Sequence, residues 1–198
     1  MKVIIATKNA GKVKEFKKIL EPYGFEPVSM TEAGFDDNIT EDGETFAENA
    51  HIKAKAIYKK CYLPVIADDS GLEVEFLNGA PGIYSARYCG DHATDKERCD
   101  KILEEMQGVD KPLRNARFVC AIYFILNDEE EFCVSGTLEG FIGEEAIGEN
   151  GFGYDPIFYV DEDKSVAMLS DDEKNQISHR GKALKNLIKE LEKKNYDK

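Results

Sequence analysis

Residues 2–20, KVIIATKNAGKVKEFKKIL, combine an apolar run, a polar turn and a helical pattern in one stretch. The run over 2–6 is short and continuous, as in a buried strand. After TKNAGK, apolar side chains recur at Val13, Phe16 and Ile19, which is the spacing of one helix face. A strand, a turn and a helix in this order predict the first βα unit of an α/β fold.

Three further helices are predicted. Residues 46–58 are rich in alanine, the strongest helix former. Thr94, with Glu97 three residues later, has the pattern of a capping box, and we expect the helix that it opens to run to about Met106. The tail over 171–194 places its apolar residues on one stripe and its lysines elsewhere, as in an amphipathic helix.

Three further strands are predicted between these helices. Residues 63–67 form an apolar run, which we expect to stop at the acidic pair Asp68 and Asp69. Residues 117–126 and 131–142 flank NDEE and predict a hairpin of two long strands. The elements alternate in type and polar motifs follow two of the strands, so we predict a mixed α/β fold whose hairpin region forms a second lobe beside a cleft.

Composition limits the classes of protein that this chain can belong to. Its 198 residues are 42% hydrophobic, which is enough for a substantial core in one domain. The formal net charge is -13, and such a surface repels a nucleic acid backbone. Unless its few basic groups are concentrated in one place, we therefore expect no nucleic acid partner, and a polyanionic small molecule needs local lysine, arginine or metal charge.

Cysteine spacing and hydropathy indicate the compartment. The five cysteines show no CxxC spacing and have no histidine in zinc-ligand register, so we expect reduced thiols. The longest apolar run, 118–126, is about half of the ~20 residues that a membrane helix needs. We therefore predict a soluble cytoplasmic protein with no membrane partner.

The turn TKNAGK has the features of a phosphate site. Asn9 and Gly11 leave backbone N–H groups available at the start of a helix, and Lys12 adds an ammonium. It is not a Walker P-loop, because the GxxxxGK[ST] pattern fails and Val13 stands where that pattern needs a hydroxyl. A plain βα turn with a surface lysine is the alternative interpretation.

Two acidic segments are candidates for metal and base chemistry. Asp68 and Asp69 follow an apolar run, and carboxylates in such a place can hold Mg²⁺ or deprotonate a water. A capped turn is the alternative interpretation of this pair. The segment TEDGE offers Glu41, Asp42 and Glu44 as a second acidic source, for which the alternative is a helix-entry cap.

Three other segments carry polar or aromatic candidates. Lys53 lies on the alanine-rich helix, where a lysine is usually part of a solvated face. In FGYDPIF, Phe152 and Tyr154 are suited to an aromatic wall for a base, with a glycine-bracketed strand edge as the alternative. In SHRGKAL, Ser178 is suited to cap a helix, so the His–Arg pair after it lies at a helix start, where a base carbonyl or a phosphate can be bound. A surface pair without a binding role is the alternative interpretation.

Six motifs together resemble the Ham1-like family of inosine/xanthosine triphosphate pyrophosphatases. In chain order they are TKNAGK, ENAxxKA, ADDSGL, PGIYSARY, GFGYDPIF and SHRGKAL. The resemblance runs from residue 3 to about 187 and implies an elongated α/β fold with a central mixed β-sheet flanked by helices. It implies one catalytic domain over 1–198, with two lobes and an active-site cleft between them. It further implies a homodimer and Mg²⁺-dependent hydrolysis of the α-β phosphoanhydride of ITP, dITP and XTP, with Mn²⁺ as an alternative metal.

The resemblance also implies roles for individual residues. Asp69 is expected to be the general base and a metal ligand, Glu41 the second metal ligand, and Asp68 a supporting member of the charged site. Residues 7–12 are expected to wrap the triphosphate, and 152–155 to enclose the base. The full set of expected substrate-binding residues is Thr7, Lys8, Asn9, Ala10, Gly11, Lys12, Lys53, Ser70, Phe152, Gly153, Tyr154, Asp155, Lys174, His179 and Arg180.

Selectivity is expected to depend on the 6-position of the purine, where inosine and xanthosine carry a carbonyl and adenosine an amino donor. Donors from His179, Arg180 or the nearby backbone are expected to bind that carbonyl, and guanosine must be rejected through its 2-amino group. Two rival functions are a Maf-like pyrophosphatase and a nucleotide sensor without turnover. The motifs FGYDPIF and SHRGKAL argue against the first rival, and the pair Asp68 and Asp69 argues against the second.

Overall fold

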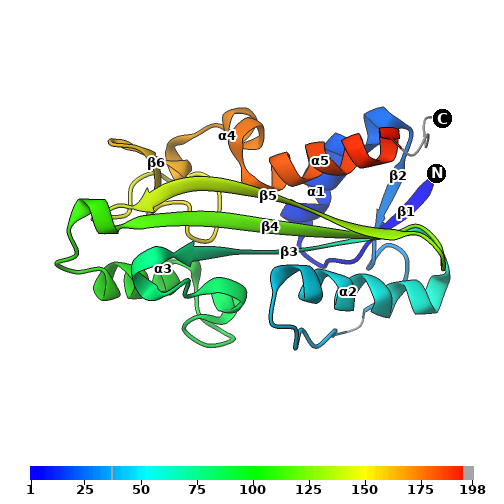
Figure 1. Cartoon of the computed structure of the whole chain (residues 1–198), viewed down its shortest axis with the longest axis horizontal. Coiled ribbons are helices and arrows are strands. Elements are labelled where there is room, and N and C mark those ends of the chain that lie inside the picture. The colour runs from blue at the N-terminus through cyan, green and yellow to red at the C-terminus, as the bar shows by residue number, and fades with distance from the viewer. Residues whose placement is uncertain (37, 194–198) are drawn as a thin grey trace. The chain divides into compact units, whose positions relative to one another are not determined.

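The computed structural model describes residues 1–36 and 38–193 and contains a seven-stranded sheet with helices packed on it (Figure 1). The strand order is β2-β1-β3-β4-β5-β6-β7. β1 pairs in parallel with β2 and β3, whereas β6 pairs antiparallel with β5 and β7, so the sheet is mixed. The strands are β1 (Lys2–Ile5), β2 (Glu26–Ser29), β3 (Val65–Val74), β4 (Asn115–Ile125), β5 (Glu131–Ile142), β6 (Phe158–Asp161) and β7 (Lys164–Ser165). The helices are α1 (Ala10–Leu20), α2 (Phe46–Cys61), α3 (Asp95–Glu105), α4 (Asp171–Ile177) and α5 (His179–Lys193).

The chain divides into two compact units. The first unit consists of Met1–Asp69, Cys120–Gly136 and Lys182–Lys198. The second unit consists of Ser70–Val119 and Thr137–Gly181. Along the chain, β3, β4 and β5 each have residues in both units. The predicted mixed α/β class is confirmed, and each unit has a buried core of its own.

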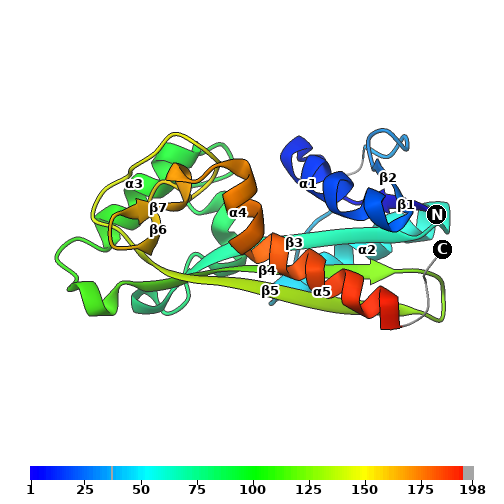
Figure 2. The same ribbon diagram turned by 90° about the horizontal axis from the view of Figure 1, so that it is seen from above.

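In the first unit the side chains of β1 point alternately to the two faces of the sheet. Ile5 belongs to a core with Phe16 of α1 and Leu187 of α5. Ile4 belongs to a second core with Ile57 of α2. α1 and α5 cover one face of the sheet and α2 covers the other (Figures 1 and 2). A strand that is covered on both faces needs apolar residues at every position, which explains the continuous apolar run at the start of the chain.

In the second unit α3 packs on the sheet over a separate core. Ile102 and Met106 are fully buried there with Leu72 of β3. The rings of Phe118 and Phe158 lie 4.5 Å apart in the same core. Burial of each such side chain stabilises the fold by roughly 1.5–3 kcal/mol, so α3 is fixed firmly against the strands.

The acidic pair lies inside a strand, and the prediction that the strand stops there is wrong. β3 continues from Val65 through Asp68 and Asp69 to Val74. Asp68 is 2% exposed and Asp69 is half-buried, so both project from a paired strand rather than from a turn. The strand continues because the ladder of main-chain hydrogen bonds does not depend on side-chain polarity, and buried carboxylates are tolerated when they are paired.

The tail forms two helices where one continuous helix was predicted. α4 ends at Ile177, and Ser178 has an extended backbone with ψ 152° before α5 begins. The Ser178 hydroxyl accepts the Gly181 N–H at 3.0 Å, which confirms the predicted cap. Lys194, where the prediction ended this helix, lies outside the described residues. No helix within 1–36 and 38–193 is both long enough and apolar enough to cross a membrane.

Candidate active site

A group of charged side chains surrounds Lys53 in the first unit. Its Nζ lies 2.8 Å from Glu41 Oε2 and 3.3 Å from Asp69 Oδ1. α2 supplies the lysine, β3 supplies Asp69 and the segment before α2 supplies Glu41. The side chain of Lys53 is 12% exposed, so this lysine is not the solvated face residue that the alternative interpretation described.

Asn49 completes this group, and sequence reasoning missed it. Its Nδ2 donates to Asp69 Oδ2 at 3.2 Å, and its Oδ1 accepts the Gly43 N–H at 2.9 Å. The side chain therefore ties the segment that carries Glu41 to β3. Asn49 lies four residues before Lys53, which puts both on one helix face, and that spacing was the available signal. We call Glu41, Asn49, Lys53 and Asp69 the Lys53 cluster.

Local sequence fixes the position of α2 and so of two members of the Lys53 cluster. Thr45 caps the helix by accepting the Glu48 N–H at 3.1 Å, and the Glu48 carboxylate accepts the Thr45 N–H in return. A Cβ on Gly43 would lie 2.7 Å from Glu48 Cβ, so the chain passes too close for any larger residue there. This tight approach places the TEDGE segment against the start of the helix.

The turn TKNAGK brings one of its lysines to the acidic pair. Asn9 caps α1 by accepting the Lys12 N–H at 3.1 Å, and the Thr7 hydroxyl accepts the Asn9 N–H at 3.2 Å. Lys12 Nζ then lies 2.9 Å from Asp68 Oδ2. The ammonium of Lys8 lies 2.8 Å from Asp36 on another loop, while Ala10 and Gly11 form the exposed first turn of the helix.

The Lys53 cluster carries more negative than positive charge. Burial raises the pKa of the Asp69 carboxyl; Lys53 opposes this effect and Glu41 adds to it. Burial acts to lower the pKa of Lys53, but Asp69, Asp68 and Glu41 together raise it above its ordinary value. An ammonium that is shared by several carboxylates leaves part of their charge uncompensated, which a further cation would balance.

The donor atoms of this cluster suit Mg²⁺. Glu41 and Asp69 offer hard carboxylate oxygens on either side of one cationic centre, which is the ligand type that Mg²⁺ prefers. Within the part of the chain that the structure describes, no three His, Cys, Asp or Glu side chains are grouped as a complete set of metal ligands. An ion held by two carboxylates would therefore take its other ligands from waters and phosphate oxygens, as Mg²⁺ commonly does.

A second polar group lies in the second unit around Asp155. Its Oδ2 accepts a hydrogen bond from Lys174 Nζ at 2.7 Å and from the Phe152 N–H at 2.8 Å. Lys174 Nζ also lies 4.2 Å from the centre of the Phe152 ring. Burial raises the pKa of the Asp155 carboxyl and Lys174 opposes this effect. The result is a fixed loop from which Phe152, 43% exposed, projects.

The other predicted residues of the second unit differ in exposure. Tyr154 is 5% exposed in the core, and its hydroxyl donates to the Ser85 carbonyl at 2.8 Å. His179 is buried and stacks on Phe118 with 4.9 Å between ring centres. Arg180 is buried with its guanidinium 6.0 Å from the centre of the Phe152 ring. Ser70 is half-buried on β3. Phe152 is thus the aromatic residue of this segment that is open to a ligand.

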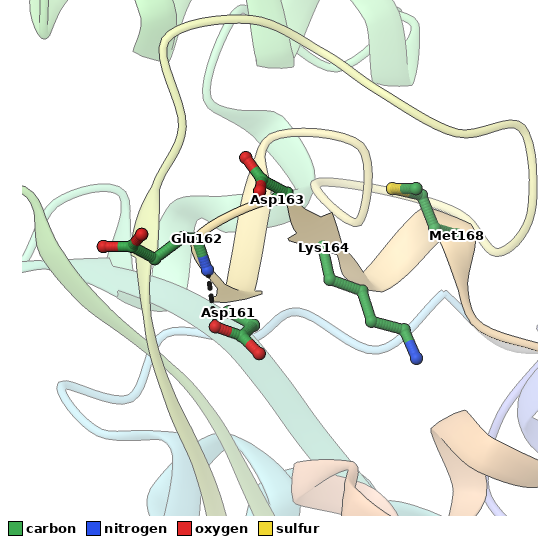
Figure 3. A pocket seen from close by; sticks show the side chains of 5 residues that line it. All are labelled: Asp161, Glu162, Asp163, Lys164 and Met168. Atoms are coloured by element: carbon green, nitrogen blue, oxygen red, sulfur yellow. Dashed lines mark hydrogen bonds between the residues drawn. The ribbon is translucent and has the colours of Figure 1, made fainter.

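A hollow of about 410 Å³ in the second unit has none of these residues in its lining (Figure 3). Its lining residues are Asp161, Glu162, Asp163, Lys164 and Met168. Glu162 pairs with Lys111 at 3.0 Å, and Lys164 lies 3.6 Å from Glu173. Three carboxylates repel a triphosphate, so the hollow does not suit the predicted substrate.

The fold and the Lys53 cluster define a class: an α/β protein that holds paired carboxylates and lysines on β3 and the neighbouring helices. The Ham1 family matches residues 3–190. The chain belongs to the Ham1 family, and the resemblance expected from the six motifs is confirmed.

Similar proteins and similar structures support the assignment to this family. A protein of Bacillus subtilis (strain 168) named dITP/XTP pyrophosphatase is 54% identical over 190 residues, covering 96% of each chain. The structure of the Staphylococcus aureus Ham1 protein is similar to this one with a TM-score of 0.90 and 44% identity, covering 98% of this chain and 100% of that one. A HAM1 protein from Coxiella burnetii gives a TM-score of 0.90 at 42% identity, covering 98% and 99%.

Proposed function

We propose that this chain is a nucleoside triphosphate pyrophosphatase that hydrolyses ITP, dITP and XTP to the monophosphate and pyrophosphate. The proposal rests on the hydrogen bonds that fix the Asp69 carboxylate: the Lys53 ammonium donates to one oxygen and the Asn49 amide donates to the other. The Bacillus subtilis relative named dITP/XTP pyrophosphatase supports the choice of substrate. This activity removes deaminated purines from the nucleotide pool.

We propose Glu41 and Asp69 as the residues that hold Mg²⁺. Of the three acidic residues considered in TEDGE, Glu41 reaches Lys53 Nζ, whereas Asp42 and Glu44 are exposed. When bound by these residues, Mg²⁺ would supply positive charge that polarises phosphate oxygens. The excess negative charge of the Lys53 cluster supports this assignment.

The residues of the chain carry out the remaining chemistry. Asp69 Oδ2 takes a proton from a water whose oxygen bonds to the α-phosphorus. The α-β bridging bond breaks, and pyrophosphate leaves with the electron pair. When substrate binds, the ammonium groups of Lys12 and Lys53 turn from their carboxylate partners to phosphate oxygens, where they stabilise the negative charge that accumulates. Backbone N–H groups of residues 7–12 bind other phosphate oxygens at the start of α1.

A separate set of residues is assigned to the purine. Phe152 stacks on the base, because it is the exposed aromatic ring of the 152–155 segment. Lys174 and Arg180 are held close to that ring and supply donors, and His179 lies beside Arg180 in the chain. A donor that is directed at the 6-carbonyl rejects the amino group of adenosine, because two donors leave each other unpaired.

The test of this activity is pyrophosphate release from ITP, dITP, XTP, GTP, ATP and dTTP, with Mg²⁺ and with a chelator. Metal-dependent release from the inosine and xanthosine nucleotides alone supports the proposal. Release from dTTP would favour a Maf-like enzyme, and binding of ITP without release would favour a sensor. Arg180→Ala is expected to lower the preference for ITP over ATP, and unchanged selectivity would remove Arg180 from this role.

The metal assignment has a test that does not depend on turnover. Ligands that bind only the folded state raise the melting temperature, so Mg²⁺ is expected to raise it in the wild type, and Mn²⁺ to act in the same way. Glu41→Gln is expected to remove most of this shift. Glu44→Gln is the matched control, because Glu44 is exposed and lies three residues away. Equal shifts in both variants would exclude Glu41 as a ligand.

We also propose that the enzyme is a cytoplasmic homodimer. Exposed apolar side chains such as Phe76, Tyr84 and Leu113, at 47%, 54% and 54% exposure, support an association surface. Light scattering on the eluting protein is expected to give twice the mass of the 22.2 kDa chain, and a monomer mass would reject the dimer. Cell fractionation is expected to recover the enzyme with cytoplasmic markers.

A further inference from the structure

One face of α3 holds both backbone polar groups of Gly153. Asp95 Oδ2 accepts the Gly153 N–H at 2.6 Å, and Cys99 Sγ donates to the Gly153 carbonyl at 3.3 Å. Asp95 and Cys99 are four residues apart on the helix, so they lie on the same face. Gly153 lies between Phe152 and Tyr154, in the segment assigned to the purine.

The contact fixes a residue that has no side chain of its own to hold it. Gly153 has φ +64°, a conformation that residues with a side chain rarely adopt. Its position therefore depends on what binds its N–H and its carbonyl. The neighbouring ring of Phe152 is exposed, so the direction in which that ring projects is set by the backbone on either side.

The groups that hold Gly153 are themselves fixed. Arg98 Nη2 pairs with Asp95 Oδ1, and Arg98 Nη1 donates to the carbonyls of Ala86 and Ala93. Asp95 is the first residue of α3, whose start is set by the capping box described for Thr94. The helix, the ion pair and the loop thus form one connected structure.

The thiol of Cys99 is suited to donate a lasting hydrogen bond to the Gly153 carbonyl. Cys99 is 3% exposed and carries a thiol that is not part of a disulfide. Burial raises the pKa of the Cys99 thiol to about 12, and Asp95 and Asp100 contribute to this rise. The thiol therefore stays protonated at neutral pH and keeps its hydrogen bond to Gly153.

We propose that Asp95 and Cys99 are positioning residues that set the place of Phe152 and, through it, the purine selectivity of the enzyme. The proposal rests on the function proposed above and adds α3 to the parts of the chain that determine selectivity. Neither residue touches the nucleotide in this scheme. Both act through Gly153, because the Phe152 ring can hold a stacked base in place for the donors of Lys174 and Arg180 only if its own backbone is held in place.

Kinetics on matched variants test this role. Asp95→Ala is expected to raise KM for dITP by on the order of tenfold and to lower the preference for dITP over dATP by a similar factor. kcat is expected to change less than KM, because the Lys53 cluster is untouched. Asp95→Asn keeps an acceptor for the Gly153 N–H and is expected to restore most of the selectivity. Equal losses in both variants would show that charge, not the loop contact, matters, and would overturn the proposal.

Glu97→Ala is the control for stability of the helix. It removes the Glu97 half of the capping box and lowers the stability of α3 without touching Gly153. We expect a lower melting temperature with unchanged selectivity. A loss of selectivity equal to that of Asp95→Ala would mean that the role is merely structural.

Hydrogen exchange separates this inference from the proposed activity. The Gly153 amide is expected to exchange at least tenfold faster in Asp95→Ala than in the wild type, and at the wild-type rate in Glu97→Ala. Cys99→Ala is expected to show a smaller increase. Unchanged exchange in Asp95→Ala would overturn the positioning role even if the enzyme is active. An inactive wild type with the expected exchange pattern would instead overturn the proposed activity alone.

Discussion

The ammonium of Lys12 lies 2.9 Å from the buried carboxylate of Asp68, on the residue directly before the proposed base. The Asp68 side chain is 0% exposed, whereas that of Asp69 is 13% exposed and is held by Lys53 and Asn49. Two adjacent carboxylates therefore have different surroundings. Asp68 has the environment of a fully buried ion pair, whereas Asp69 keeps a small exposed fraction beside its two hydrogen-bond donors.

The acidic pair is expected to separate stability from activity. Asp69→Asn should lower turnover by at least about 100-fold, because the amide cannot accept the proton. The variant should melt no lower than the wild type, since burial raises the pKa of Asp69 and the fold therefore disfavours its charge. Pyrophosphate release and thermal unfolding measure the two effects.

Asp68→Asn is the matched comparison. It leaves the Lys12 ammonium without its carboxylate, and we expect a loss of roughly 2 kcal/mol in the free energy of unfolding. In a protein of this length that corresponds to a melting temperature lower by about 4–8 °C. If Asp69→Asn were the less stable of the two variants, the division of roles would be wrong.

Lys53→Met is expected to destabilise the protein most strongly when divalent cations are absent. The change leaves Glu41 and Asp69 close together without their shared ammonium, and removing one partner of a buried ionic group costs about 3–5 kcal/mol. Added Mg²⁺ should recover part of the loss by replacing the missing charge. Lys55→Met is the control, because Lys55 is exposed on the same helix. Equal destabilisation of the two variants would contradict the prediction.

Arg114 is expected to be essential for the stability of the second unit. It is 4% exposed and donates to the main-chain carbonyls of Met106, Val109, Ile142 and Gly143. Arg114→Met should cost about 3 kcal/mol or more, because buried carbonyls lose their donors.

Urea unfolding measures this loss for Arg114. Arg114→Lys should recover little of the lost stability, since one ammonium cannot reach all the carbonyls to which the guanidinium donates. Lys111→Met, on an exposed side chain, is the control and should change stability by less than about 0.5 kcal/mol. A fully stable Arg114→Met protein would show that the carbonyls find other donors.

Stability is expected to fall at alkaline pH as buried tyrosines ionise. Burial raises the pKa of Tyr123 to about 12, and its hydrogen bond to Glu131 adds to the effect. The pKa values of Tyr58, Tyr88, Tyr154 and Tyr159 are raised as well. Because the folded values exceed the unfolded value of about 10, this contribution is complete below pH 10 and is lost as pH rises towards 12.

Absorbance at the tyrosinate band measures this titration in folded and denaturant-unfolded protein. The folded protein should titrate in a late step that is absent from the unfolded one. Glu131→Gln should lower the pKa of Tyr123, because it removes the carboxylate that accepts the hydrogen bond. Coincident titration of folded and unfolded protein near pH 10 would contradict the prediction.

Local patterns predicted the helix starts correctly. Thr94 with Glu97, and Ser178 before α5, specify helix starts through hydrogen bonds that span three residues, so the sequence contains the whole interaction. The turn after β1 was placed correctly for the same reason. The sequence predicted both a cap at Ser178 and a helical stretch over 171–194, and the structure follows the cap: α4 ends at Ile177 and α5 begins at His179.

Features that depend on distant segments were not predictable in the same way. β3 continues through the acidic pair because neighbouring strands supply its hydrogen bonds, and no nearby residue signals this. β2, β6 and β7 have four residues or fewer, too few to show a period. The contact between Glu41 and Lys53 joins residues 12 positions apart, and the partner of Lys8 lies 28 residues away.

Three helices begin with the same reciprocal cap, formed by Thr45 and Glu48, by Thr94 and Glu97, and by Ser170 and Glu173. In each case a residue assigned to the site or to its positioning follows within two turns: Lys53, Asp95 or Lys174. A helix that began one residue early or late would rotate its side chains by about 100°. Each cap therefore fixes the direction in which the functional side chain of its helix points. An inserted or deleted residue just after the cap would turn that side chain away from its partners, even if the core still folded.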